Sequence, residues 1–249
     1  MSWLAAAVVA LAFGSAVLSV VTGAAGGVIL LSGLLLLAPA SAVVPVHGVV
    51  QTAGCLTRIG AFHRHVRWDI VGRFVVGVVP GALIGTFVIE RLLDLNESVV
   101  KLIIAVAILL SLFAHKIKIE ASPKSLRAFY GVGFATGLLG MVAGSTGPIT
   151  SQALLLYGVD KEPHVATKSV VQAIGHGIKI PLFGMALGFD FGEWALPILG
   201  MTVMTVLGTL VGKRLLDKMS HAHFELGARV LLGIVAIQIA VTEVWTLAS

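Results

Sequence analysis

Ten apolar segments follow one another along almost the whole chain, and they constrain the fold more than any other feature of the sequence. Most of them reach the length of about 20 residues that lets a helix cross a bilayer. A chain with 57% hydrophobic and 12% charged residues is also too apolar for a soluble domain of 249 residues. We therefore expect an all-α, polytopic integral membrane protein. The segments cover roughly residues 3–22, 26–38, 43–61, 70–90, 98–115, 127–142, 147–158, 164–186, 193–213 and 226–247.

The chain has no polar stretch large enough for a separate soluble domain, so a single transmembrane domain is expected over residues 1–249. Its beginning, MSWLAAAVVA, lacks a basic leader and a clear cleavage site, which favours a first membrane segment over a signal peptide. The net charge of +5 comes from Lys and Arg residues in short loops between apolar segments. That pattern is typical of an orientation signal and does not indicate a nucleic-acid partner.

Two of the segments, which begin at Gly26 and Gly147, are too short to cross a bilayer. Each offers only about 12 residues and follows a glycine-rich break, at Thr22–Gly27 and Ala143–Pro148. Glycine and proline stop one helix and allow another to begin. We expect a broken helix and a half-spanning helix at both places.

The two halves of the chain resemble each other when the sequence is shifted by 121 residues. The matches include polar residues in register, which chance similarity among apolar residues does not readily produce. They pair Gly23 with Gly144, Gly26 with Gly147, Gln51 with Gln172, Gly54 with Gly175 and Asp69 with Asp190. We infer internal repeats over residues 1–120 and 121–249, with about five segments each. An odd number of segments inverts the second repeat, which is the plan of many secondary transporters.

Loop charges indicate the orientation, because short loops rich in Lys and Arg stay in the cytoplasm. Basic residues gather in residues 58–69 and 115–127. The opposite side receives Arg91 and Lys101, offset by Glu90, Asp94 and Glu97. We expect the two basic loops in the cytoplasm and both termini outside.

Polar side chains recur at helical spacing in two otherwise apolar segments, Pro45–Ile59 and Ala166–Ile180. Steps of three and four residues place them on one face of a helix. The first stripe consists of His47, Gln51, Cys55 and Arg58, and the second of Lys168, Gln172, His176 and Lys179. Polar groups are costly in lipid, so both stripes should face protein or a water-filled path. They form the candidate substrate pathway.

The uncharged members of the stripes each have two interpretations. Gln51 and Gln172 either hold the repeats together by weak interhelical hydrogen bonds or donate to a ligand, and their duplication favours the ligand. A single buried histidine or cysteine is more often packed than ligand-binding. This second argument applies to His47, Cys55 and His176.

The cationic members are expected near the membrane surfaces. Arg58 and Lys179 should extend to opposite interfaces, although either could guard a mouth of the pathway. Lys168 lies near the cytoplasmic end of its segment and can do the same.

The glycine-rich breaks are candidate anion sites, because a helix N-terminus offers backbone N–H groups and the positive end of the helix dipole. The candidate residues are Thr22, Gly23 and Gly26 in the first break and Ser145, Thr146 and Gly147 in the second. The alternative is that the glycines only allow close helix packing. Two matching breaks, each followed by a short helix, favour a binding site.

The acidic residues indicate the charge of the ligand. All twelve Asp and Glu residues lie at or near segment ends, whereas a cation carrier normally needs a carboxylate inside a span. Neutral donors and basic groups occupy the central positions and favour an anion. The pairs His63 with His65 and His221 with His223 lack Cys or acidic partners at ligand spacing, so no metal or other cofactor is expected.

On these features the chain resembles the TauE/SafE sulfite exporter family, also called TSUP. The likeness covers nearly the whole chain: duplicated halves, a glycine-rich break in each, and the small-residue helix starts Pro45–Gly48 and Ala166–Ser169. It also includes the turn His65–Asp69, followed by Pro80–Gly85. The resemblance implies a multi-pass transporter of the bacterial inner membrane. It would move sulfite, sulfonates such as sulfoacetate, or related small sulfur anions, usually outward.

We therefore expect a secondary transporter in which Gln51 and Gln172 line one central site close to Thr22, Ser145 and Thr146. A channel-like facilitator for another small anion, a membrane-embedded enzyme and a structural role are the alternatives. Against the enzyme, the sequence offers no paired intramembrane Asp, nucleotide-binding loop or dense histidine cluster. The expected partners are a small anionic sulfur compound and the lipid bilayer, with a homodimer left open.

Overall fold

The computed structural model describes residues 3–22, 26–95, 99–100, 102–103, 106, 125–159, 161–216 and 218, and within these ranges the chain is helical and has no strand. Gly23 and the side chain of Thr22 lie outside the described residues, as do most of the expected segment 98–115 and all of 226–247. The elements are α1 (Trp3–Thr22), α2 (Gly26–Leu37), α3 (Ala40–Phe62), η1 (His63–His65), α4 (Trp68–Leu93), α6 (Ala128–Ala143), α7 (Gly147–Leu156), α8 (Lys161–Gly177), α9 (Lys179–Pro181), η3 (Leu182–Ala186) and α10 (Ala195–Leu216).

Among the expected segments that the structure describes, the bounds agree with the helices to within about three residues at each end, with one exception. The segment expected over residues 164–186 is not one continuous helix: α8 ends at Gly177, and α9 and the π-helix η3 follow it. Pro181 has no N–H group and removes one helical hydrogen bond. Further on, the N–H of Leu187 donates to the carbonyl of Leu182, five residues back, at 3.1 Å. This wider turn is what makes η3 a π-helix.

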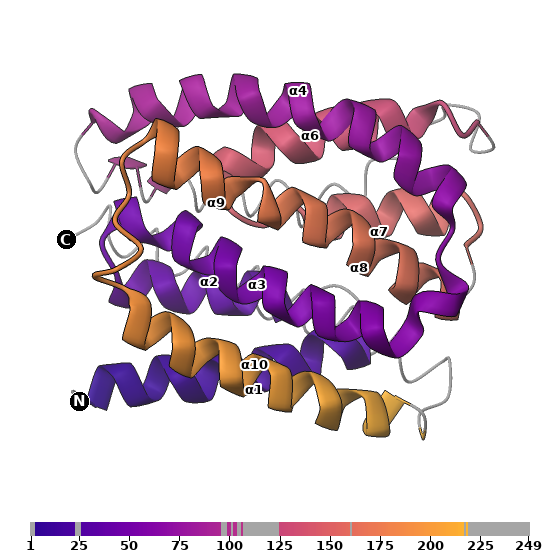
Figure 1. The fold of residues 1–249 in the computed structure, drawn as a ribbon, viewed down its shortest axis with the longest axis horizontal. Helices are drawn as coiled ribbons and strands as arrows, with labels where there is room; N and C mark the ends of the chain where they lie inside the picture. The colour runs from indigo at the N-terminus through magenta and orange to yellow at the C-terminus, as the bar shows by residue number, and fades with distance from the viewer. Residues whose placement is uncertain are drawn as a thin grey trace.

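The helices lie side by side along the long axis of the molecule in three groups (Figure 1). On one side α4 packs against α6, on the other α1 packs against α10, and α3 and α8 pack together between them. The short helices α2 and α7 also join this arrangement, α2 against α1 and α3, and α7 against α6 and α8. Each long outer pair therefore joins a helix from the first part of the chain to one from the second.

The two short helices begin at the glycine-rich breaks. α2 has 12 residues and α7 has 10. At 1.5 Å per residue they extend about 18 Å and 15 Å, well below the roughly 30 Å of a hydrocarbon core. Neither is long enough to cross a bilayer.

The two ends of the molecule carry opposite charge. At the right-hand end in Figure 1, α3 and α10 end and α4, α6 and α8 begin. We call it the basic end, after Arg64, Arg67, Arg127, Lys213 and Arg214. At the opposite end α4 ends and α10 begins. We call it the acidic end, after Glu90, Asp94, Asp190 and Glu193.

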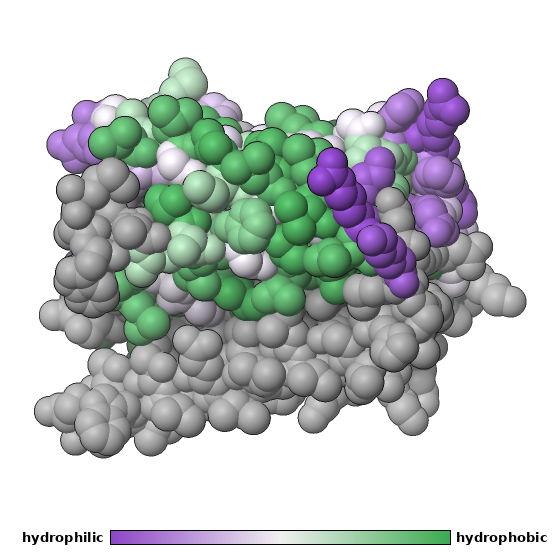
Figure 2. Space-filling model, turned by 90° about the horizontal axis from the view of Figure 1, so that it is seen from below, coloured by the Kyte–Doolittle hydropathy of each residue, from purple (hydrophilic) through white to green (hydrophobic). Residues whose placement is uncertain are grey.

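The outer surface between these ends is apolar. Phe87 on α4 and Leu196 on α10 are each 70% exposed, far more than a soluble protein leaves large apolar side chains. Figure 2 shows the molecule from below the view of Figure 1. A broad hydrophobic belt crosses this face, with hydrophilic residues at its two ends. By length and composition, α4 and α10 are the two described helices able to cross a membrane. Shorter apolar helices cover Ala7–Val21, Gly26–Leu37 and Ala128–Ala143.

Glycines bring the outer helix pairs into backbone contact. A Cβ atom added at Gly77 or Gly81 of α4 would overlap the carbonyl oxygen of Tyr130 or Phe134 on α6. In the same way, Gly208 of α10 lies against the backbone of α1. Small residues permit such close approach between membrane helices.

The contact between α3 and α8 is looser. A Cβ at Gly48 of α3 would lie 3.5 Å from the carbonyl oxygen of His176 and from the Cβ of Lys179, an ordinary van der Waals distance. A Cβ at Gly177 would lie 4.0 Å from Thr52. At these glycines, α3 and α8 therefore approach less closely than the helices of the outer pairs.

Candidate functional site

The second glycine-rich break lies inside the protein. Gly144 ends α6 with a φ of +73°, a conformation that favours glycine because a side chain there would be strained. Ser145 and Thr146 follow, 2% and 5% exposed, and α7 begins at the buried Gly147. The break therefore brings two hydroxyl groups and a helix N-terminus into the interior.

Gln51 lies where the two breaks come together. A Cβ at Gly27, in the first turn of α2 next to the buried Gly26, would be 3.5 Å from the Gln51 amide nitrogen and 3.4 Å from the Ser145 hydroxyl. The Gln51 side chain, 5% exposed, and Ser145 thus flank the beginning of α2. Gln172 lies half-buried on α8. Neither amide is hydrogen-bonded to another described residue, which is not what a structural bridge between the repeats requires.

A cluster on the acidic-end side of Gln51 consists of His47, His176 and Lys179, and we call it the outer cluster. The Lys179 ammonium donates to the carbonyl oxygen of Gly144 at 2.5 Å and lies 3.3 Å from Nδ1 of His176. The imidazoles of His176 and His47 meet edge to face, with ring centroids 5.3 Å apart. The outer cluster therefore connects the end of α6 to α3 and α8.

His47 extends this cluster to the first break. Its Nε2 atom is 2.8 Å from the carbonyl oxygen of Gly27, and the whole side chain is buried. Its Nδ1 atom has no hydrogen-bond partner among the described residues. Because the Gly27 carbonyl only accepts, Nε2 carries the proton of the neutral ring and Nδ1 is left as an acceptor.

The expectation that Lys179 extends to a membrane interface is wrong. Its side chain is 2% exposed, because it points inward toward the carbonyl groups left unpaired at the end of α6. Gly140 makes room for it: a Cβ there would be 3.5 Å from the Lys179 Cε atom. A last-turn carbonyl is a favourable partner for a cation, because it is the negative end of the helix dipole.

The same expectation is wrong for Arg58. It is 4% exposed and belongs to a second cluster, with Cys55 and Ser169, which we call the inner cluster. Arg58 donates through Nε to the Ser169 hydroxyl at 3.3 Å and through Nη2 to the Cys55 sulfur at 3.0 Å. Lys168, 5% exposed, precedes Ser169 on α8. It is also buried rather than extended to a surface.

One polar pair was missed by the sequence interpretation. Ser151 on α7 lies 2.8 Å from Nε2 of His164 on α8, and both side chains are buried. His164 stands four residues before Lys168 and so continues the second stripe. Because His164 is the first residue of the expected segment 164–186, it was not counted among the polar residues inside that segment.

The buried charges in the described part of the chain are all positive. They are Arg58, Lys168 and Lys179, whereas no described Asp or Glu is buried. Burying cations without carboxylates is costly unless dipoles or an anion compensate. The interior thus favours an anionic ligand, and the described residues hold no group of three or more potential metal ligands.

An ion pair at the basic end fixes the turn before α4. Arg67 contacts Asp69 at 2.6 Å, and its backbone N–H donates to the Thr167 hydroxyl at 2.9 Å. The hydrogen bond to Asp69 raises the pKa of the Arg67 guanidinium above its usual value. This pair ties the turn to α8 and lies outside the two clusters.

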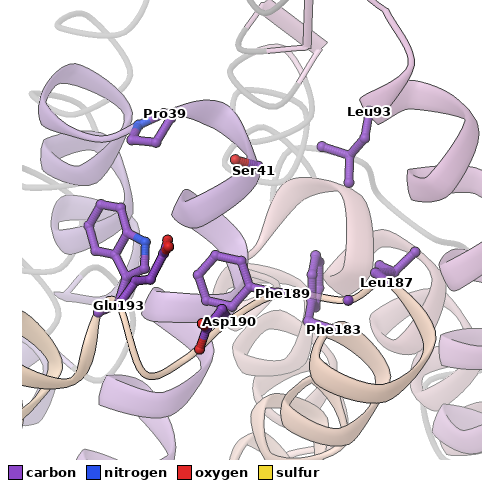
Figure 3. Close-up of a pocket in the computed structure, with 10 residues that line it drawn as sticks. Pro39, Ser41, Leu93, Phe183, Leu187, Phe189, Asp190 and Glu193 are labelled. Atoms are coloured by element: carbon purple, nitrogen blue, oxygen red, sulfur yellow. The ribbon is translucent and has the colours of Figure 1, made fainter.

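A cavity of about 440 Å³ opens at the acidic end (Figure 3). It is lined by Pro39, Ser41, Leu93, Phe183, Leu187, Gly188, Phe189, Asp190, Glu193 and Trp194. Phe183, 2% exposed, stands four residues after Lys179 and therefore lies near the same helix face. One aromatic residue thus borders both the cavity and the helical turn that carries the outer cluster.

Comparison with known proteins gives one match. The family profile described as "Sulfite exporter TauE/SafE" matches residues 7–239. Neither a curated protein nor a solved structure matches the chain significantly.

Proposed function

Because the chain belongs to the TauE/SafE sulfite exporter family, whose members are membrane transporters rather than enzymes, we propose that it exports a small sulfur oxyanion across a bacterial inner membrane. Sulfite and small sulfonates such as sulfoacetate are the proposed substrates. The family supplies the class of transported molecule. The interior of this chain supplies the argument for where it binds.

One observation carries the proposal: the buried Lys179 ammonium and the side chains of Gln51 and Ser145 gather at the two breaks, in a described interior without a buried carboxylate. Hydrogen bonds from charged or dipolar donors are the usual means of holding an oxyanion. Lys179 would supply the charge and Gln51 and Ser145 the directed donors, while His47 would hold the beginning of α2 through its bond to Gly27. The helix N-termini of α2 and α7 add their N–H groups.

The other predicted site residues have secondary roles in this proposal. Gln172, Lys168 and Cys55 continue the pathway toward the basic end. Thr146 and Gly147 form the beginning of α7, and His176 positions Lys179 through their 3.3 Å contact. Thr22 and Gly23 stay predictions from the sequence.

We further propose that the chain is one transmembrane domain of two inverted repeats, residues 1–120 and 121–249. The packing supports this plan. Under the repeat, α10 is the equivalent of α4 and α1 is the equivalent of α6. The contact between α4 and α6 is matched by the contact between α10 and α1. The pairs Arg58 with Cys55 and Lys179 with His176 are also equivalent under the 121-residue shift.

The proposed orientation places the basic end in the cytoplasm, by the positive-inside rule, and both termini in the periplasm. The cavity at the acidic end would then be the periplasmic exit, where Asp190 and Glu193 disfavour the return of an anion. The test is surface labelling in a Cys55→Ala background. Arg64→Cys should react only from the cytoplasmic side and Glu193→Cys only from outside, and the reverse result would overturn the orientation.

Substrate binding is tested by a thermal-shift screen with sulfite, thiosulfate, sulfoacetate, taurine and acetate. A ligand that binds only the folded state raises the melting temperature, and the shift grows as its concentration exceeds the Kd. Sulfite or sulfoacetate should raise it and acetate should not. Equal shifts with all five compounds would remove the argument for a sulfur oxyanion.

Transport is tested in proteoliposomes loaded with the anion that binds best. Flux of the unchanged anion supports the proposal, whereas a chemically altered product would identify an enzyme. Accumulation against a concentration gradient separates a coupled transporter from a facilitator.

A further inference from the structure

The Ser151–His164 pair belongs neither to the outer cluster nor to the inner cluster. His164 is the fourth residue of α8, which begins at the basic end, and Ser151 lies in α7. The two side chains are 4% and 7% exposed, with 2.8 Å between the hydroxyl oxygen and Nε2. A polar pair buried this deeply near one end of the molecule needs an explanation.

The second ring nitrogen of His164 makes the pair unusual. Nδ1 is buried and has no hydrogen-bond partner among the described residues. Leaving a buried polar group unpaired is unfavourable, because it has lost its hydrogen bonds to water. A histidine that served only to hold α7 against α8 would normally use a carbonyl or carboxylate to satisfy this atom.

The bond to Ser151 allows two arrangements, because a hydroxyl can donate to Nε2 or accept from it. A neutral imidazole carries one N–H group, so when the Ser151 hydroxyl donates to Nε2 the proton lies on Nδ1. Nδ1–H is then a fixed donor. An anion next to Nδ1 favours the tautomer with the proton on Nδ1. In the other tautomer, Nδ1 would direct a lone pair toward the anion.

His164 also continues a regular series along α8. Lys168, Gln172 and His176 follow at intervals of four residues, which is about 6 Å per step. The Lys168 ammonium is close enough to His164 to interact with it electrostatically. A donor at His164 therefore stands one step nearer the basic end than the first buried cation.

We propose that Ser151 and His164 form a cytoplasmic-side subsite that binds the sulfur oxyanion before it reaches the inner cluster. This inference rests on the proposed function. In the bound arrangement Ser151 donates to Nε2, His164 donates through Nδ1–H, and Lys168 provides favourable charge one helical turn further in. Several weak successive positions, rather than one tight one, suit a path that must also release its substrate.

The test exploits two substitutions that each preserve one nitrogen of the ring. His164→Asn places an amide N–H near the position of Nδ1, and His164→Gln places one near Nε2, where it can still pair with Ser151. The apparent KM for sulfite is measured in inside-out vesicles, which present the cytoplasmic side to the medium. We expect about a tenfold rise in His164→Gln and less than about a threefold change in His164→Asn.

A matched control is His63→Ala, which removes an exposed imidazole at the same end of the molecule. It should leave the KM unchanged. A pair that served only as a bridge between helices gives the opposite order, with His164→Gln close to the unaltered protein and His164→Asn impaired. That order, or an equal loss in both variants, overturns the subsite.

Failure of the proposed function can be told apart from failure of the subsite. The purified variants are also titrated with sulfite in the thermal-shift assay. If the unaltered protein binds sulfite but does not move it, the transporter proposal fails, and the order of affinities among the variants still decides the subsite. If it neither binds nor moves sulfite, both proposals are overturned.

Discussion

The contact between α4 and α6 differs in kind from the contact between α3 and α8. Backbone meets backbone in the first, and a methyl group at Gly81 would overlap α6. The backbones lie farther apart in the second, and Gly48 has ordinary van der Waals space around it. The buried charged side chains of the described residues all belong to α3, α8 and α9. The molecule thus separates a tightly packed frame from a central pair of helices that carries the chemistry.

This difference indicates how stability and binding are divided. Close-packed backbones cannot rotate or slide without losing contact, so the outer pairs suit an invariant frame. Hydrogen bonds among long side chains can be exchanged one for another. Substitutions in the outer pairs should therefore affect stability without affecting binding. Substitutions along α3 and α8 should affect binding without affecting stability.

The largest effect is expected for Lys179→Met. Removing a charged donor to an anion costs about 1.5–3 kcal/mol, so affinity for sulfite should fall by roughly ten- to a hundredfold. The melting temperature without ligand should stay level or rise, because burying an ammonium is costly. Thermal shift with and without sulfite measures both. Arg91→Met, which removes an exposed cation at the acidic end, is the control.

Gln51→Ala should lower sulfite affinity by about tenfold, since it removes one neutral donor to a charged ligand. The protein should remain folded and inserted. Gln172→Ala tests whether the equivalent position on α8 contributes equally. Unaltered binding and transport in both variants would show that the amides do not line the site.

Gly81→Ala should give the reverse pattern, with a loss of stability of about 1–3 kcal/mol from overpacking and unchanged sulfite affinity. Gly72→Ala is the control on the same helix, where an added Cβ would meet nothing within 4 Å. Thermal unfolding of both variants is the measurement. If Gly81→Ala weakens binding more than stability, the frame and the path are not separate.

Cys55→Ala should have the smallest effect. Sulfur is a weak acceptor, and Arg58 keeps its bond to Ser169, so stability should fall by at most about 1 kcal/mol. The affinity for sulfite should not change. A tenfold loss of sulfite binding in this variant would instead assign the thiol to the site.

Much of the fold could be predicted because hydrophobic runs and glycine breaks act locally. The beginnings of α2 and α7 follow from Gly26 and Gly147, where the chain itself stops one helix and starts another. The stripes on α3 and α8 follow from helical periodicity. The inward direction of Arg58 and Lys179 could not be predicted in this way, because the sequence-based prediction treated each helix alone. It left out the open carbonyl of Gly144 and the hydroxyl of Ser169 on neighbouring helices.

Ser151 and His164 were missed for a related reason. They stand 13 residues apart on two helices, so no single helical period connects them. The break of the expected segment 164–186 into three pieces was also beyond the pattern. Hydropathy does not change at Pro181, whereas the backbone hydrogen bonding does.

The partners of the outer helices have a consequence for biosynthesis. α1 is made first and its partner α10 follows about 170 residues later, and α4 likewise precedes α6. At 5–20 residues per second, the nascent chain holds α1 without its partner for roughly ten to forty seconds. During that interval lipid, or an insertion chaperone, must cover a surface shaped to meet a glycine-lined helix. The two halves therefore cannot fold as independent units. An arrest of translation between them would leave a fragment in which α1 and α4 lack their partner helices.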